Sequence, residues 1–189
     1  MKLRPVVFLA LILGTFASFA QTAPTRQVDS ARSKLTVHVG KAGMFSAFGH
    51  EHDIAAPVFS GAVRGQESAE FSVDARQMKV ADTEVSEKDR AEIHTTMLGP
   101  EVLDAARFPE IKFRSTAVER EKDGWRVRGD LTLHGQMRAI VLSVKQVGDR
   151  YTGTSTFKQT DFGIKPVSAG GGSVKVKDEV TVTFEIALK

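Results

Sequence analysis

The chain has 189 residues and no cysteine, and its 26 basic and 23 acidic side chains give a formal net charge of +3. Hydrophobic residues make up 41% and charged residues 26%, which is typical of a globular domain with a sizeable core. The absence of cysteine excludes a disulfide scaffold, and the balanced, scattered charges give no support to nucleic-acid binding.

The first twenty residues have the pattern of a secretory signal peptide. Lys2 and Arg4 precede an apolar run over residues 6–17, and residues 18–20 form a small-x-small cleavage site. The apolar run is shorter than the roughly 18–20 residues that cross a bilayer, so a membrane anchor is the weaker interpretation. We therefore expect cleavage before Gln21, a periplasmic or secreted product, and no membrane span.

Residues 21–32 are polar and aperiodic, which predicts a flexible leader before a single domain over residues 33–189. Within this domain, apolar and polar residues alternate with the period of two that indicates β-strands with one buried face. The clearest run covers residues 180–188. The side chains predicted on the buried faces are Leu35, Val37, Val39, Phe71, Val73, Ile111, Phe113, Trp125, Val127, Leu131, Leu133, Ile140, Leu142, Val144, Tyr151, Ser155, Phe157, Val180, Val182, Phe184, Ile186 and Leu188.

One helical insertion is expected to interrupt the strands at about residues 86–107. Ser86 and Asp89 have the spacing of a loose capping box at its start. Further along, Gly99 and Pro100 are expected to open a short helix, since proline suits a first helical turn. Pro109 disfavours the α conformation at the residue before it and should end that helix. The buried stripe of this short helix is predicted to be Val102, Leu103 and Ala106.

Three short polar segments are expected to be turns of antiparallel hairpins, at residues 122–124, 148–150 and 177–179. Strands joined in this way, each with one apolar face, favour a closed sheet that exposes no edge strand. The predicted fold is therefore mainly β: an antiparallel eight-stranded lipocalin-like barrel with a short helical insert near residues 86–107. An immunoglobulin-like sandwich is the alternative, but it gives no reason for the insert.

Four segments, in this order, carry a resemblance to one known family. Residues 33–48 contain a strand followed by Phe-Ser-Ala-Phe, and residues 103–113 read L-D-A-A-R-F-P-E-I-K-F. Residues 129–135 read G-D-L-T-L-H-G, and residues 160–164 read T-D-F-G-I. Together they resemble the YceI family over residues 33–189. The resemblance implies an exported lipocalin-like barrel that associates with polyisoprenoids or other long-chain lipids, and it leaves room for a homodimer.

The apolar interior of such a barrel is the first candidate site. An eight-stranded barrel either fills its interior with side chains or holds one small, elongated ligand. Each buried methylene group of a ligand tail contributes about 0.8 kcal/mol, so a long acyl or prenyl chain needs no catalytic chemistry to bind tightly. The alternative is that the same side chains simply fill the core. The candidate ligand-binding residues are Phe71, Met97, Leu98, Leu103, Phe113, Leu131, Leu133, Phe157 and Phe184.

The second candidate site lies where the chain departs from the family pattern, at residues 49–54. On an extended segment the imidazoles of His50 and His52 point to the same side and could bind one divalent metal. Further ligands could come from Asp53, His38, His94 or His134 if the fold brings them near. The alternative is an exposed loop with two solvated histidines.

No recognisable catalytic motif accompanies these candidates: the chain has no Gly-x-Ser-x-Gly, no cysteine and no His-Glu-x-x-His. We therefore predict a protein without enzymatic activity that carries or sequesters a long-chain amphipathic lipid, such as a polyisoprenoid, and has no cofactor besides that lipid. The competing hypothesis is a metal-binding protein, enzyme or sensor that uses the His50 and His52 pair.

Overall fold

The computed structural model describes residues 23–42, 51–169 and 174–189. The predicted signal peptide, the Phe-Ser-Ala-Phe segment and His50 lie outside these residues, so the predictions made for them stay predictions.

The described residues form one antiparallel sheet with a single α-helix, α1 (Glu87–Leu98). Short 3-10 helices lie at Ser30–Arg32 (η1), Ala75–Gln77 (η3) and Gln159–Phe162 (η4). The strands are β1 (Thr25–Gln27), β2 (Lys34–Ala42), β3 (His52–Ala55), β4 (Val58–Arg64), β5 (Ser68–Asp74), β6 (Lys79–Val80), β7 (Glu110–Glu121), β8 (Gly124–Leu133), β9 (Gln136–Val147), β10 (Arg150–Lys158), β11 (Ser168–Ala169) and β12 (Val174–Ala187).

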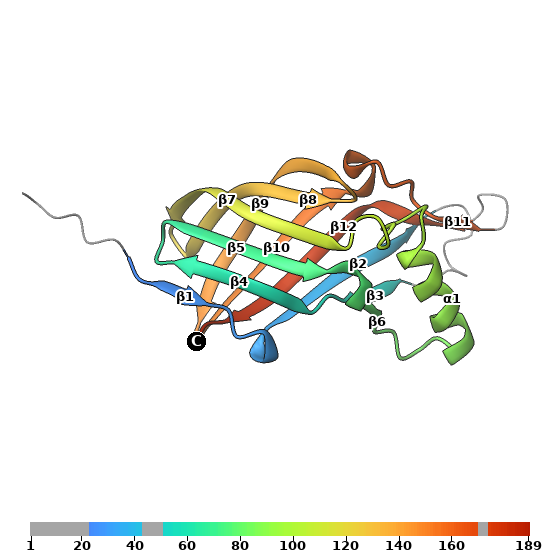
Figure 1. Ribbon diagram of the computed structural model, residues 1–189, viewed down its shortest axis with the longest axis horizontal. Coiled ribbons are helices and arrows are strands. Elements are labelled where there is room, and N and C mark those ends of the chain that lie inside the picture. Colours follow the sequence, from blue (N-terminus) through green and yellow to red (C-terminus); the bar gives the residue numbers. More distant parts are fainter. Residues whose placement is uncertain (1–22, 43–50, 170–173) are drawn as a thin grey trace, which may run out of the picture.

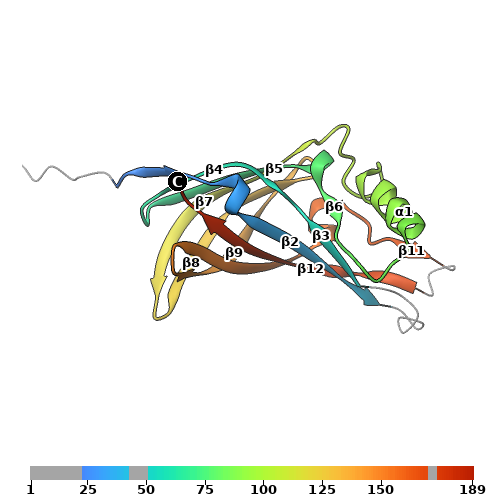
Figure 2. The same ribbon diagram turned by 90° about the horizontal axis from the view of Figure 1, so that it is seen from below.

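The sheet curls around an interior, and α1 lies at the end of that interior opposite the C-terminus (Figures 1 and 2). Its hydrogen-bonded order is β1-β4-β5-β7-β8-β9-β10-β12-β2-β3-β6, with β11 paired to β12. The mainly β, antiparallel prediction with one helix is confirmed, and the sheet forms a half-barrel. The closed, eight-stranded barrel is not confirmed, because eleven strands of the described residues lie along a hydrogen-bonded path that runs from β1 to β6.

The extra strands arise partly from a break at residues 56–57. β3, before the break, pairs with β2, whereas β4, after it, pairs with β5. Pro57 has no N–H to donate to a neighbouring strand, which explains why the ladder stops there. A single run of chain thus contributes strands near the two opposite ends of the hydrogen-bonded order.

The predicted flexible leader, residues 21–32, is wrong from residue 25 onward. Residues 25–27 form β1, which pairs with β4, and the Val28 N–H donates to the carbonyl of Gly61 at 2.8 Å. The Asp29 N–H donates to the carbonyl of Ala187 at 2.9 Å. This short segment therefore ties β4 to the end of β12, and backbone pairing of that kind is not visible as sequence periodicity.

Two of the three predicted hairpins are confirmed: β7 pairs with β8 around residues 122–123, and β9 pairs with β10 around residues 148–149. The third is wrong, because residues 177–179 lie inside β12. The register between β12 and β2 shifts between Val176 and Val180, so the polar segment is a bulge in one long strand. Polar residues of the same types occur in β-bulges and in turns, so the sequence pattern does not distinguish a bulge from a turn here.

The helical insert is shorter than predicted, and its second part is not helical. The capping prediction is confirmed, since the Asp89 N–H donates to the Ser86 hydroxyl at 3.1 Å. The helix ends at Leu98, and residues 99–107 are turns. Pro100 lacks the N–H that would bond to the carbonyl of Thr96, and the Gly99 N–H takes that carbonyl instead, at 3.1 Å. Pro100 therefore follows the end of one helix and does not begin another.

Candidate functional site

The curved sheet encloses an apolar cavity of about 190 Å³. Every side chain that lines it is apolar except Ser155 and Gln159. Both polar groups are already engaged: the Ser155 hydroxyl donates to the carbonyl of Val141 at 2.9 Å, and Gln159 Nε2 donates to the carbonyl of Lys177 at 2.8 Å. The lining side chains that the structure describes therefore suit a hydrocarbon.

The structure places eight of the nine predicted ligand-binding residues on the cavity wall, namely Phe71, Met97, Leu103, Phe113, Leu131, Leu133, Phe157 and Phe184. The ninth, Leu98, does not line the cavity and packs, partly buried, against the core. Met97 and Leu98 are adjacent in α1, and successive side chains of an α-helix point about 100° apart, so only one of the two faces the cavity. Whether the eight residues contact a ligand stays a prediction.

Much of the wall comes from residues other than the nine candidates. The inward faces of β2, β9 and β12 supply Leu35, Val37, Val39, Ile140, Leu142, Val180, Val182 and Ile186. The period-two alternation had already placed these side chains on buried faces, so that signal could have identified them. The prediction favoured large aromatic and leucine side chains, whereas a cavity is bounded as much by small β-branched ones.

Several inward-pointing residues remain partly accessible, and this distinguishes a cavity from a filled core. Val37, Val39, Phe157, Val182 and Phe184 line the interior but are only partly buried. In a close-packed core, apolar side chains in such positions lose nearly all contact with solvent. Their exposure is toward the interior space, so this space is a real opening in the packing.

Glycines opposite the aromatic side chains help to keep the space open. Gly61 lies directly across from Phe71, and Gly153 lies directly across from Phe184. A Cβ on Gly153 would lie 2.5 Å from Phe184 Cζ, and one on Gly129 would lie 2.4 Å from Phe113 Cζ. Because these glycines have no side chain, the phenyl rings can lie against the strand beside them. The rings therefore form part of the wall and do not fill the centre.

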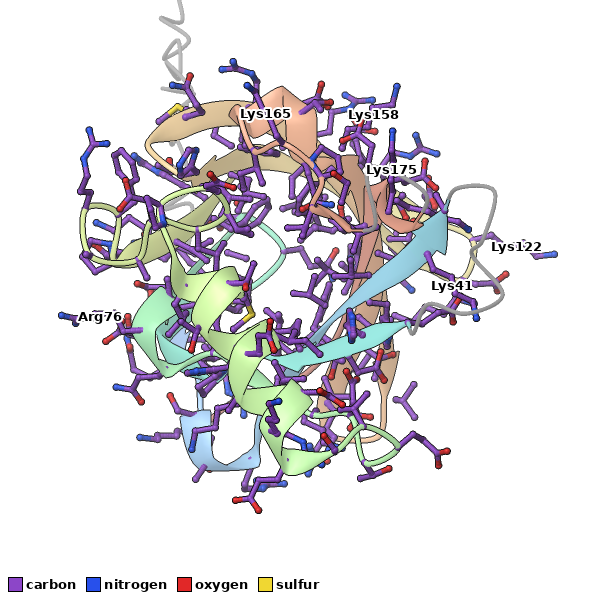
Figure 3. The ribbon with its side chains drawn as sticks, turned by 90° about the vertical axis from the view of Figure 1, so that its right-hand side faces the viewer. Lys41, Arg76, Lys122, Lys158, Lys165 and Lys175 are labelled. Atoms are coloured by element: carbon purple, nitrogen blue, oxygen red, sulfur yellow. The ribbon has the colours of Figure 1, made fainter. Side chains whose placement is uncertain are left out.

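The two ends of the interior differ. The end near the C-terminus is closed by a second cluster of buried side chains, Val28, Val58, Ile186 and Leu188. The other end lies beside α1, and Gln159 and Met97 line the cavity there. Figure 3 views the molecule onto this end and shows Lys158, Lys165 and Lys175 along one side of it. At the α1 end, therefore, a polar lining residue and three lysines lie near one another.

The three later family-like segments meet at this end. The Phe108 ring packs edge-on against the ring of His134, with centroids 5.1 Å apart. His134 Nδ1 lies 3.2 Å from the carbonyl of Phe162, and the Phe162 ring packs edge-on against Phe157. We call the three residues Phe108, His134 and Phe162 the rim joint. It connects the loop before β7, the β8–β9 turn and η4.

Two of the candidate histidines, His38 and His52, pair with carboxylates, and the described residues offer no support for a metal site. His52 Nδ1 lies 2.7 Å from Asp82 Oδ2, and His38 Nδ1 lies 2.7 Å from Asp53 Oδ1. Among the residues that the structure describes, no three His, Asp or Glu side chains come together as metal ligands. His52 and Asp82 instead join β3 to the segment that leads into α1. The proposed partner of His52 in metal binding, His50, lies outside the described residues.

Asp178 holds η4 against the bulge of β12. The Thr160 N–H and hydroxyl donate to its two carboxylate oxygens at 2.9 and 2.8 Å, and these bonds, the first above all, lower the pKa of the carboxyl from its ordinary 3.8. Because the carboxyl has a lower pKa in the folded protein than in the unfolded chain, its ionised form stabilises the fold at pH values above its ordinary pKa of 3.8. This stabilisation is lost as the pH falls through the pKa of the folded state.

We expect Asp178→Asn to lower the free energy of unfolding by about 1 kcal/mol at neutral pH, because it weakens two hydrogen bonds to a partly exposed carboxylate. The difference should shrink as the pH falls below about 4. Urea unfolding of both proteins between pH 3 and 7 measures it. Asp161→Asn, a change on η4 at an exposed carboxylate, is the control and should show little difference; an equal loss there would contradict the assignment.

A curved antiparallel sheet around an apolar cavity is the arrangement of a barrel-like binding fold. Residues 27–188 match the YceI-like domain, and the chain belongs to the YceI-like family. No helix in the described ranges is long and apolar enough to cross a membrane.

Relatives and solved structures agree with this assignment. A UPF0312 protein of Pseudomonas syringae pv. tomato is 34% identical over 135 residues, 61% of this chain and 67% of its own. A UPF0312 protein of Shewanella oneidensis is 29% identical over 200 residues, 95% of this chain and 97% of its own. BcnA of Burkholderia cenocepacia has a similar fold, with a TM-score of 0.62 at 22% identity over 84% of this chain and 98% of its own. A polyisoprenoid-binding domain from Saccharophagus degradans gives a TM-score of 0.57 at 16% identity over 87% of this chain and 97% of its own.

Proposed function

We propose that this protein binds a long-chain amphipathic lipid of the polyisoprenoid or fatty-acyl type and carries or sequesters it, without catalysing a reaction. The observation that carries the proposal is the apolar cavity: among its described lining residues two side chains are polar, and both are hydrogen-bonded to backbone carbonyls. A ligand that fits such walls is a hydrocarbon tail. The name of the Saccharophagus degradans domain, which shares the fold, supports a lipid of this kind.

The energy of such binding comes from burial of the tail. Each methylene group removed from water contributes about 0.8 kcal/mol, so ten of them offset a large part of the cost of immobilising a ligand. No directed hydrogen bond is needed inside the cavity. This explains how a site without reactive side chains can still bind with useful affinity.

The head group of the lipid is proposed to lie at the end beside α1. The other end is closed by the cluster around Val28 and Leu188, which leaves no path for a polar group. At the α1 end a head group would meet Gln159 and the lysines 158, 165 and 175, which can offer hydrogen bonds or positive charge. The signal-like residues 1–20 favour action in the periplasm or outside the cell.

Native mass spectrometry of the purified protein tests the proposal. We expect a bound lipid mass on the wild-type protein and at least a tenfold smaller bound fraction on Val182→Asp, because a carboxylate in an apolar cavity is strongly unfavourable. Thr154→Asp places the same charge on the exposed side of the neighbouring strand β10 and should leave the bound fraction unchanged. Thermal unfolding of both variants shows whether each is folded.

A protein that is folded, carries no lipid and takes up none from added fatty acids or prenols would contradict the proposal. Equal lipid content in the Val182→Asp and wild-type proteins would place the ligand elsewhere.

A further inference from the structure

The volume of the cavity limits the number of tail carbons that it can enclose. The cavity measures about 190 Å³. For comparison, an apolar cavity of about 150 Å³ in a protein core is sufficient for benzene, which has six carbons. On the same scale, the space in this protein holds about eight carbons in a compact arrangement.

The depth of the cavity gives a second measure of the tail length. Val180 and Ile186 both line it and lie six residues apart on β12. Six residues of an extended strand cover about 20 Å, and barrel strands tilt by about 35–45° from the axis, which leaves about 15 Å along the interior. An extended hydrocarbon advances about 1.3 Å per carbon, so about twelve carbons reach from one end to the other.

The far end does not offer an extension. Val28, Val58, Ile186 and Leu188 form a buried cluster there, and Leu35, Phe71, Tyr151 and Phe184 pack against it. Lengthening the cavity in that direction would require these side chains to separate. A longer tail must therefore emerge beside α1.

From these two measures we infer that the cavity encloses a single tail segment of about eight to twelve carbons, so that medium-chain acyl amphiphiles fill it completely. This inference rests on the proposed function and specifies its ligand class. A polyisoprenoid of forty carbons would place only its first two or three isoprene units inside and leave the rest of its tail exposed at the α1 end. Added carbons beyond about twelve contribute no further burial.

The test is a chain-length series. Saturated carboxylates with six to sixteen carbons are titrated below their micelle concentrations into purified protein freed of lipid, and affinity is measured by displacement of a fluorescent fatty-acid analogue. Affinity should rise by up to about fourfold for each added methylene group and reach a plateau between eight and twelve carbons. A continued rise through sixteen carbons would overturn the inference. Tighter binding of a C40 polyprenol than of a twelve-carbon alcohol would overturn it as well.

Two variants at cavity residues should move the plateau in opposite directions. Val182→Phe adds four carbons to the wall and should shift the plateau to chains about four carbons shorter. Phe157→Leu removes three carbons and should shift it to chains about three carbons longer. Thr154→Phe, on the exposed side of β10, is the matched control and should not move it. A plateau that does not move in either cavity variant, with both folded by thermal unfolding, would also overturn the inference.

These outcomes are distinct from a failure of the proposed function. If no carboxylate, alcohol or prenol of any length binds, the lipid-binding proposal itself is wrong. If lipids bind but affinity does not depend on this length range, only the inference on tail length is wrong.

Discussion

Replacement of Phe162 by alanine is expected to lower the free energy of unfolding by about 3–5 kcal/mol. The Phe162 side chain has 0% of its surface exposed, and its ring packs edge-on against Phe157 with centroids 5.3 Å apart. Its removal leaves an apolar void where η4 meets the barrel wall, and the void costs energy beyond the lost burial. Equilibrium unfolding in urea measures the effect.

Val167→Ala is the control for this experiment, because Val167 lies in the segment that follows η4 and its side chain is 37% exposed. It should change the free energy of unfolding by less than about 0.5 kcal/mol. A loss below about 1 kcal/mol for Phe162→Ala would mean that the η4 region unfolds locally or collapses around the void, and that the rim joint contributes little to stability.

Gly153→Ala should both destabilise the fold and obstruct the cavity. The new Cβ would lie 2.4 Å from the carbonyl oxygen of Ser143 and 2.5 Å from Phe184 Cζ. The Ser143 carbonyl belongs to β9, which is paired with β10, so it cannot move without disturbing the hydrogen bonds between these strands. The contact with Phe184 would push its ring away from the cavity wall. We expect a loss of about 1–3 kcal/mol in unfolding free energy and weaker binding of a twelve-carbon carboxylate.

Gly40→Ala provides the matched comparison. A Cβ on Gly40 would approach only the flexible Lys177 side chain, at 2.9 Å from its Cδ, so the lysine can turn aside. This variant should keep nearly all of its stability and all of its lipid binding. If both glycine variants behave alike, the loss at Gly153 reflects general strand propensity and not the contact with Phe184.

The strands and their inward faces were predictable because alternation is a local property of the chain. Phe113 and Leu131 were placed on buried faces from period two alone, and the structure pairs them directly across β7 and β8. The helix start at Ser86 was predictable for the same reason, since a cap involves residues only three apart. These features depend on neighbours along the chain.

The features that sequence patterns missed depend on pairing between distant strands. The local pattern around Pro100 predicts the start of a helix, but proline is common both there and just after a helix end, so the pattern does not distinguish the two positions. Two further features become visible only when the strand register is known. Residues 52–64 divide between two parts of the sheet, and Gly153 lies across from Phe184. The existence of a cavity depends on such cross-strand contacts, so composition and periodicity could suggest it but not give its size.

The rim joint of Phe108, His134 and Phe162 has a consequence for how proteins with this architecture diversify. It stabilises the scaffold through contacts at one end, and none of its three residues lines the cavity. Substitutions inside the barrel can therefore alter the cargo while this connection stays intact. Two proteins that share these segments can therefore belong to one family and still bind different ligands. The side chains that line the interior are a better basis for predicting the ligand than family membership.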